Sequence, residues 1–425
     1  MKVVIMAGGK GTRIASVNSE IPKPMIQICG KPILQHQMEC LKGQGYVDIV
    51  LIIGYLGYVI KDYFQDGNRF GVRISYIEEK EPLGTAGALY YLKDVIADDF
   101  LLINGDIIFD VDIGRFYAAH RQKGALATIF THPNSHPYDS GLIVSEADGK
   151  VSRWLHKEDE RGWYKNSVNA GLHILSPDIL RLFDEPVKKD LDRDILRPLI
   201  KNGALYSYCS PEYVKDMGTP DRYCEVSNDI QTGLVKRKNL TVRQKAFFLD
   251  RDGTINKYVG FLTDINQFEL VEGAAKAIRL INEHGFLAIV ITNQPVIARG
   301  EVSPDELREI HNKMETLLGL EGAYVDDIFY CPHHPNKGFP GERIEYKKEC
   351  GCRKPEPGLI LEAARRYNVD LSQSVMIGDG MADVEAGKRA GCKTAFIGTE
   401  KIEGTESYHN LLTCVEQLLN VGSKN

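Results

Sequence analysis

Apolar segments that end in glycine or in an acidic residue recur along the first half of the chain. The clearest are Lys2 to Ala7, Val47 to Ile53, Val72 to Ile77 and the run from Phe100 that ends at Asp106. A stretch with helical character separates the second and third of these predicted strands. Such strand and helix alternation predicts an α/β fold with a mostly parallel sheet, whose site lies at the carboxyl ends of the strands.

The same pattern starts again after residue 245, so the sequence predicts a second α/β unit. An apolar strand runs from Lys245 to Leu249, a helical stretch covers Gly273 to His284, and a further strand covers Leu287 to Ile291. A chain of 425 residues is also too long for one ordinary core. We therefore predict two domains of the α/β class.

Composition narrows the function classes. With 43% hydrophobic residues, 26% charged residues and a net charge of −6, the chain is typical of a soluble globular protein and has no polycation signature for nucleic acid. The longest apolar run, Ile49 to Ile60, is too short to span a bilayer, and the N-terminus lacks the order of a signal peptide. We expect a cytoplasmic enzyme of small-molecule substrates, without a membrane partner, and leave a homo-oligomer open. Nine cysteines in a chain of this length do not indicate a disulfide scaffold.

The first predicted strand runs into a glycine-rich loop, Gly8-Gly9-Lys10-Gly11-Thr12-Arg13. Bare backbone N–H groups at such a junction bind phosphates; the alternative is a plain tight turn. The loop is neither a dinucleotide fingerprint nor a Walker A motif. Downstream, Pro22 and Pro24 fix the backbone around Lys23, which would hold one positive charge rigidly against a phosphate. Alone, that lysine could equally be solvated.

Together, the G-G-x-G-T-R and P-K-P-M segments resemble the sugar-1-phosphate nucleotidyltransferases, over residues 1–232. This resemblance implies a Rossmann-like domain in which Arg13, Lys23 and the loop residues Gly8, Gly9, Gly11 and Thr12 act on the nucleotide phosphates. It also implies that Asp106 and Asp216, the latter in K-D-M-G-T-P, hold a catalytic Mg²⁺.

Three further segments fit the same family. The L-G-T-A-G loop with Gly84 and Thr85 is similar to the base-side loop of guanylyltransferases, although uridylyl enzymes carry close variants. Asn169 and Gly171 resemble the sugar-contacting loop. Lys157 resembles a lysine that approaches the sugar phosphate; its alternative is a solvated side chain.

After a predicted closing helix from Asp221 to Thr232, residues 233–244 have the composition of a linker. The basic run from Lys236 to Asn239 predicts an exposed connector. The second domain is then expected over residues 245–425.

Two carboxylates leave the strand that opens the second domain, Asp250 and Asp252. Two aspartates one residue apart can divide the roles of nucleophile and proton carrier, with Mg²⁺ offsetting their repulsion. The alternative is a capped turn of the Asp-Gly type. The D-x-D-G-T motif resembles the haloacid dehalogenase (HAD) phosphatases. The resemblance extends to Thr292 at the end of the next strand, to Lys354 as the phosphoryl-stabilising lysine, and to Asp379 with Asp383 in G-D-x-x-x-D. It assigns Mg²⁺ to Asp250, Asp252 and Asp379, with Asp383 as the second acid of the G-D-x-x-x-D pair that holds the ion.

A C-x-H pair and a C-x-C pair lie between these signatures: Cys331 with His333, and Cys350 with Cys352. Three thiolates and one imidazole form a closed tetrahedral Zn²⁺ set, which predicts a structural site. His334 is the alternative histidine, although the spacing favours His333. Two unrelated cysteine pairs would be the other interpretation.

A capless HAD domain with this zinc loop, a T-N-Q segment and I-A-R-G resembles the heptose bisphosphate phosphatases, with histidinol phosphatases as close relatives. The resemblance implies that Asn293, Arg299 and Arg353 contact the substrate. This chain departs from the family pattern at Pro295-Val296, where Ser-Gly is usual, in a loop that borders the substrate.

The two resemblances together imply consecutive steps toward GDP-D-glycero-α-D-manno-heptose, with phosphatase action first. One alternative is a mannose-1-phosphate guanylyltransferase joined to an unrelated or histidinol-phosphatase-like enzyme. Another is that one half is a non-catalytic sugar-binding module.

Overall fold

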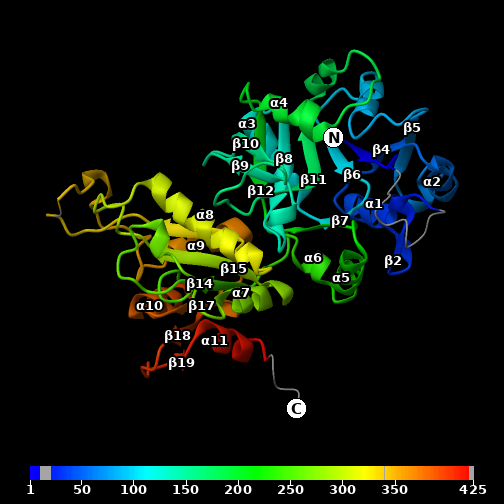
Figure 1. Cartoon of the computed structure of the whole chain (residues 1–425). Helices are drawn as coiled ribbons and strands as arrows, with labels where there is room; N and C mark the ends of the chain where they lie inside the picture. Colours follow the sequence, from blue (N-terminus) through cyan, green and yellow to red (C-terminus); the bar gives the residue numbers. More distant parts are fainter. Residues whose placement is uncertain (10–20, 339, 421–425) are drawn as a thin grey trace. The chain divides into compact units, whose positions relative to one another are not determined.

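The computed structural model describes residues 1–9, 21–338 and 340–420 (Figure 1). The chain falls into two compact units. The first comprises Met1–His132, Ile143–Leu155 and Asn169–Asn239; the second comprises Pro133–Leu142, His156–Val168 and Leu240–Asn425. Each unit has an α/β architecture, as the sequence predicted.

A mixed sheet forms the middle of the first unit, with strand order β10-β9-β11-β6-β1-β4-β5. Strands β6, β1, β4 and β5 run parallel, as the sequence predicted, whereas β11 is antiparallel to β6. The strands are β1 (Lys2–Met6), β4 (Asp48–Ile53), β5 (Arg73–Glu78), β6 (Phe100–Asn104), β8 (Ala127–His132), β9 (Leu142–Ser145), β10 (Val151–Leu155), β11 (Val168–Leu175) and β12 (Leu205–Cys209). Strand β8 joins β12 to the sheet next to β11.

Two short ribbons and several helices complete this unit. The ribbons pair β2 (Gln27–Ile28) with β3 (Lys31–Pro32), and β7 (Ile107–Asp110) with β13 (Tyr213–Asp216). The helices are α1 (Ile33–Gly43), α2 (Gly57–Phe64), α3 (Ile113–Lys123), α4 (Arg197–Leu199), α5 (Pro220–Gln231) and α6 (Leu234–Arg237). Alternate residues of β1 enter different cores: Val3 and Ile5 pack with α1 and α2, and Val4 packs on the opposite face.

The second unit has a six-stranded, fully parallel sheet of order β16-β15-β14-β17-β18-β19. Its strands are β14 (Ala246–Leu249), β15 (Leu287–Asn293), β16 (Asp327–Cys331), β17 (Val375–Gly378), β18 (Lys393–Ile397) and β19 (Glu406–Tyr408). Its helices are α7 (Ala274–Glu283), α8 (Pro304–Leu320), α9 (Gly358–Tyr367), α10 (Met381–Ala390) and α11 (Leu411–Leu418).

Helices cover both faces of this sheet. Phe247 and Leu249 pack toward α7, α8 and α11, while Ala246 and Phe248 pack toward α9 and α10. A parallel sheet buried on both faces gathers the ends of its central strands at one edge, which is where loops can carry chemistry.

The expectation of an exposed connector is corrected in part. Leu234 and Val235 are buried in α6, and Lys238 and Asn239 are each only 6% exposed. The amide of Asn239 donates to Asp110 Oδ1 at 2.6 Å. Only Lys236 and Arg237 of the basic run are solvated, because apolar neighbours and this hydrogen bond hold the rest of the segment down.

Within the described ranges, none of the helices combines the length and the apolar composition that crossing a membrane takes.

Candidate active sites

Two central strands of the second unit position acidic residues of its site. Asp250 directly follows β14, and Asp379 directly follows β17, its parallel neighbour. Gly253, in the loop after β14, has φ +82°, and a Cβ there would lie 1.9 Å from Asp379 Oδ2. Only glycine allows this close approach of the two loops.

Lys354 is the positive centre of this site and lies almost wholly buried. Its Nζ is 2.7 Å from Asp250 Oδ1 and 2.5 Å from Asp383 Oδ1, and it donates to the Ile291 carbonyl at 2.7 Å. Burial alone would lower the pKa of Lys354, but the two carboxylates outweigh it and raise that pKa. The lysine therefore stays charged next to Asp250.

Oxygen atoms of Asp250, Asp379 and Asp383 lie within 4.8 Å of one another. Burial, followed by the neighbouring carboxylates, raises the pKa of both Asp250 and Asp379 to about 6. Clustered carboxylate oxygens fit a hard divalent cation, which would relieve this repulsion. Asp383 belongs to this group, whereas Asp252, which the sequence assigned to Mg²⁺, lies outside it.

The carboxylate of Asp252 is instead held by its neighbours. Arg251 Nη2 lies 2.9 and 2.8 Å from its two oxygens, Gln294 Nε2 donates at 2.9 Å and Asn256 Nδ2 at 3.0 Å. Burial would raise the pKa of Asp252, but Arg251 and these hydrogen bonds outweigh it and lower the pKa. In the free site Asp252 is ionised, so it would need the added negative charge of a substrate phosphate to carry a proton.

The end of β15 and the residue that follows it support both Lys354 and Asp252. Gln294 Nε2 also donates to Thr292 Oγ1 at 2.9 Å. The Asn293 amide accepts from Lys354 N and donates to Lys354 O, both at 3.0 Å, which fixes the backbone beside the lysine. Sequence reasoning missed Arg251, Gln294 and Asn256; their position inside or next to the D-x-D-G-T and T-N-Q motifs was the available signal.

Four residues form a compact Cys/His group at the end of β16. The sulfurs of Cys331, Cys350 and Cys352 are 3.2 to 3.5 Å apart, and His333 Nδ1 is 3.3 Å from Cys352 Sγ and 3.6 Å from Cys331 Sγ. The four residues predicted from the sequence therefore lie together, with His333 as the histidine of the group. The alternative, His334, is engaged elsewhere: its Nδ1 accepts from Asn336 N. These four donors suit a tetrahedral metal ion.

The two arginines assigned to substrate contact have protein partners here. Arg353 Nη1 donates to the His333 carbonyl at 3.1 Å, so the site lysine and the Cys/His group are linked through adjacent residues. Arg299 pairs with Glu301 at 2.7 Å and stacks on Phe261, 4.3 Å from the ring centre.

The Pro295-Val296 departure has a packing role. Val296 is 1% exposed and packs with Ile297, Val302 and Leu307 in a small apolar cluster.

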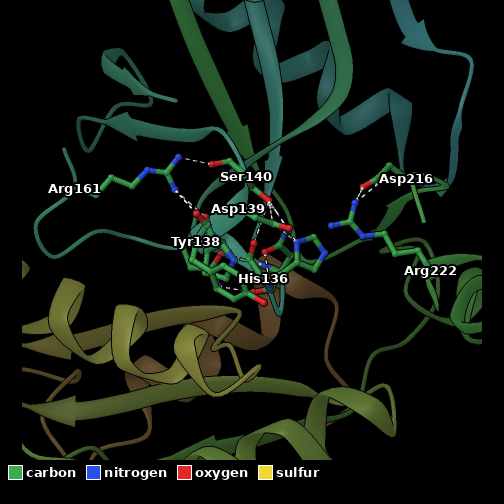
Figure 2. Close-up of polar contacts among 11 residues, drawn as sticks. His136, Tyr138, Asp139, Ser140, Arg161, Asp216 and Arg222 are labelled. Carbon is green, nitrogen blue, oxygen red and sulfur yellow. Dashed lines mark hydrogen bonds and ion pairs between the residues drawn. The ribbon is translucent and has the colours of Figure 1, made fainter. Parts of the chain in front are cut away.

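In the first unit, the predicted acids flank the β7–β13 ribbon. Asp106 precedes β7 and Asp216 ends β13, and the Met217 amide donates to the Asp106 carbonyl at 2.9 Å. Lys23 Nζ is 2.5 Å from Asp106 Oδ2. Figure 2 shows Arg222 directed at Asp216, with Nη1 2.6 and 2.8 Å from its two oxygens. Arg222 was not anticipated from the sequence.

The predicted loops of this unit are partly braced. Gly84 has φ +77° and bridges to Lys189, and Thr85 Oγ1 accepts from Leu191 N at 2.7 Å. Asn169 Oδ1 accepts from Gly171 N at 3.1 Å.

Three groups of residues that the sequence assigned to the first site remain. Gly8 and Gly9 follow β1, and a Cβ on Gly8 would meet Glu79 Oε2 at 2.2 Å. Lys157 is exposed and belongs to a segment of the second unit. Gly11, Thr12 and Arg13 lie outside the described residues.

Comparison with known proteins gives matches for both halves. The nucleotidyl transferase family model matches residues 2–233, and the HAD-hydrolase-like model matches residues 351–413. Over 160 residues the chain is 41% identical to the D-glycero-beta-D-manno-heptose-1,7-bisphosphate 7-phosphatase of Pasteurella multocida (strain Pm70), covering 37% of this chain and 84% of that protein.

Relatives of another kind match the first half. Over 252 residues the chain is 32% identical to the mannose-1-phosphate guanylyltransferase catalytic subunit beta of Danio rerio, covering 58% of this chain and 67% of that protein. The crystal structure of HddC from Yersinia pseudotuberculosis is similar with 31% identity and a TM-score of 0.48, over 54% of this chain and 99% of that one.

Proposed function

The chain belongs to the nucleotidyl transferase family in its first half and to the HAD-like phosphatases in its second, and from this premise we propose a two-step enzyme of nucleotide-sugar synthesis. In the first step it removes the 7-phosphate of D-glycero-α-D-manno-heptose 1,7-bisphosphate. In the second it transfers GMP from GTP to the resulting heptose 1-phosphate and releases pyrophosphate.

One observation carries the phosphatase half of the proposal: buried Lys354 bridges Asp250 and Asp383 beside the separately held Asp252. In the proposed reaction Asp250 attacks phosphorus, the bond to the sugar oxygen breaks, and Asp252 protonates that oxygen. Water then attacks the aspartyl phosphate, Asp252 takes its proton, and phosphate leaves. Lys354 neutralises charge on the phosphoryl oxygens.

Two metals fit the residues present. Asp250, Asp379 and Asp383 would hold Mg²⁺, which supplies charge neutralisation at the phosphoryl group when bound. Cys331, His333, Cys350 and Cys352 would hold a structural Zn²⁺, since four protein donors leave no position for water.

For the first half, we propose that Lys23 and the Gly8-Gly9 loop contact nucleotide phosphates, and that Asp106 and Asp216 hold Mg²⁺. The sugar phosphate would attack the α-phosphorus of GTP, so positioning and charge neutralisation are the main demands. Arg13, Gly11 and Thr12 belong to the same assignment. Gly84 and Thr85 would face the base, and Lys157, Asn169 and Gly171 the sugar phosphate. In the phosphatase half, Thr292, Asn293, Arg299 and Arg353 would line the phosphate.

Support for the substrate comes from the relatives. A heptose-bisphosphate phosphatase aligns with the second half and a guanylyltransferase with the first. The phosphatase relative is named for the β anomer. We propose the α anomer for this chain because we expect its first half to transfer a guanylyl group, and guanylyl transfer goes with the α anomer. The name of the other relative favours a second candidate, a mannose-1-phosphate guanylyltransferase joined to the phosphatase.

A panel of sugar phosphates and nucleoside triphosphates separates these candidates. We expect phosphate release from heptose 1,7-bisphosphate, and GDP-sugar formation from heptose 1-phosphate with GTP favoured over UTP and dTTP. A pocket built to hydrogen-bond guanine leaves its own buried polar groups unpaired when another base enters. We therefore expect a large preference for GTP. Faster reaction with mannose 1-phosphate would select the second candidate, and equal rates with dTTP would remove the guanylyl assignment.

A further inference from the structure

Two segments that precede the linker in sequence pack as part of the second unit: residues 133–142 and 156–168. We call them the platform. Both fall within the range that matches the nucleotidyl transferase family, yet they share their packing with the strands and helices that carry Asp250 and Lys354.

The platform is braced internally by polar side chains. The side chain of Asn166 accepts from Asn134 N at 3.1 Å and donates to Asn134 O at 2.7 Å. Arg161 donates to the carbonyls of Pro137, Tyr138 and Ser140 at 3.1, 3.2 and 2.6 Å, as Figure 2 shows for the labelled residues. These bonds tie the two segments to each other, so the platform can act as one body.

Helix α8 is the surface on which the platform rests. Thr316 Oγ1 accepts from Tyr164 N at 2.9 Å and Glu315 Oε2 accepts from Asn166 N at 2.8 Å. Both acceptors are buried, with 6% and 5% of their surface exposed. One turn further on, a Cβ on Gly319 would lie 2.6 Å from Pro137 Cγ. The contact is therefore close and dry along this face of the helix.

One turn earlier, the same helix contacts Arg251, the residue that holds Asp252. His311 Nε2 lies 3.2 Å from Nη1 of Arg251, whose side chain is fully buried. Burial first, and then Arg251, lower the pKa of His311 to about 3, so the neutral ring accepts this hydrogen bond. Arg251 in turn holds both oxygens of Asp252.

We propose that the platform is a positioning element of the phosphatase: by fixing α8, it fixes His311 and Arg251, and through them the carboxylate of Asp252. This rests on the proposed function, in which Asp252 transfers the proton. Residues inside the nucleotidyltransferase-matching half thereby set the efficiency of the reaction in the other half, without touching the phosphatase substrate. Thr316, Glu315 and His311 are positioning residues in this scheme.

The test uses the full-length chain and a pair of variants at one position. Thr316→Val removes the hydroxyl that accepts from Tyr164 at nearly constant volume, and Thr316→Ser keeps it. With heptose 1,7-bisphosphate, Thr316→Val should lower kcat about tenfold with KM unchanged, because proton transfer depends on the placement of Asp252. Thr316→Ser should restore most of the loss.

A second substrate distinguishes positioning from general loss of structure. The nitrophenolate of p-nitrophenyl phosphate leaves without a proton, so the burst of nitrophenolate that accompanies formation of the aspartyl phosphate, before Asp252 acts on water, should slow less than about threefold in Thr316→Val. Gly319→Leu, which displaces Pro137, should repeat this pattern. Arg308→Leu on the exposed face of the same helix should show neither effect.

Two results would overturn the proposal. One is wild-type kcat on the sugar ester in Thr316→Val and Gly319→Leu while Asp252→Asn is impaired; the other is an equal loss, with both substrates, in the rate at which the aspartyl phosphate forms. If the helix variants unfold, a second pair tests the same proposal. His311→Leu removes the acceptor for Arg251 and should show the loss on the sugar ester, whereas His311→Gln keeps an acceptor and should show less of it. A wild type that hydrolyses no sugar phosphate would instead defeat the proposed function itself.

Discussion

The two candidate sites balance their charges in different ways. In the second unit, Lys354 and Asp383 are 3% and 4% exposed and form one buried network with Asp250. In the first unit, Lys23 with Asp106 and Arg222 with Asp216 are separate pairs, with side chains 16% to 40% exposed. A buried network is costly to rearrange, whereas half-exposed pairs exchange partners cheaply.

The difference matches the chemistry proposed for each site. In the phosphatase the protein supplies the nucleophile, so Asp250 must be held in advance against phosphorus. In nucleotidyl transfer both the nucleophile and the leaving group belong to substrates. In the proposed transfer, Lys23 and Arg222 would leave their carboxylates for phosphates, and the carboxylates would turn to a cation.

The largest effect expected is the loss of the phosphatase nucleophile. Asp250→Asn should lower phosphate release by more than about 10⁴-fold, and Asp252→Asn by roughly 10²- to 10⁴-fold, since the latter removes only the proton carrier. Guanylyl transfer should survive both, as measured by GDP-sugar formation. Phosphate release at the wild-type rate from Asp250→Asn would end the covalent-aspartate mechanism.

Next in size is the effect of removing the metal from the Cys/His group. We expect one tightly held Zn²⁺ per chain, lost in Cys350→Ser or Cys352→Ser, since a structural zinc is worth on the order of 10 kcal/mol in small motifs. Metal analysis and thermal unfolding should show the loss, with phosphatase activity falling alongside through Arg353 and Lys354. Cys224→Ser, an exposed cysteine of the first unit, is the matched control. Protein purified without chelator and found free of zinc would contradict the assignment.

Much of the second unit followed from the sequence, because its chemistry sits on motifs next to apolar strands. Asp250, Lys354 and Asp379 come together as the family resemblance implied, and the four Cys/His residues as their spacing suggested. In a parallel sheet with helices on both faces, side chains that follow the strands meet at the carboxyl ends of those strands.

The missed features are contacts that no spacing encodes. The pairing of Arg251 with His311 and of Tyr164 with Thr316 joins residues 60 and 152 positions apart. Burial of Lys238 and Asn239 depended on partners such as Asp110, which a reading of the charge run cannot supply. Long-range packing decided these positions, and local composition pointed the other way.

The smallest effect expected concerns Glu315 of α8. A stability measurement on this residue tests the platform contact without reference to the active site. Burial raises its pKa to about 7, while Lys165 opposes this and Asp327 adds to it. The folded protein holds this proton more tightly than the unfolded chain, so stability falls as pH rises from about 4.5 to about 7 and stays constant above. Glu315→Gln should remove this decline and gain about 3 kcal/mol in unfolding free energy above pH 7.

Denaturant unfolding of Glu315→Gln and of wild type at several pH values measures this directly. Glu309→Gln, exposed on the same helix, is the control and should follow the wild type. Parallel stability curves for wild type and Glu315→Gln would show that this carboxyl titrates normally.

The central claim is that the two sites act in a fixed order on one sugar. A transferase pocket shaped for a neutral sugar tail would leave the charge of a second phosphate desolvated and unpaired, at a cost of several kcal/mol. Incubation with heptose 1,7-bisphosphate and GTP, with products followed by mass spectrometry, tests this claim. The wild type should make GDP-heptose, Asp250→Asn should leave the bisphosphate untouched, and Lys23→Ala should stop at heptose 1-phosphate. Accumulation of a GDP-heptose that still carries its 7-phosphate in Asp250→Asn would contradict the order.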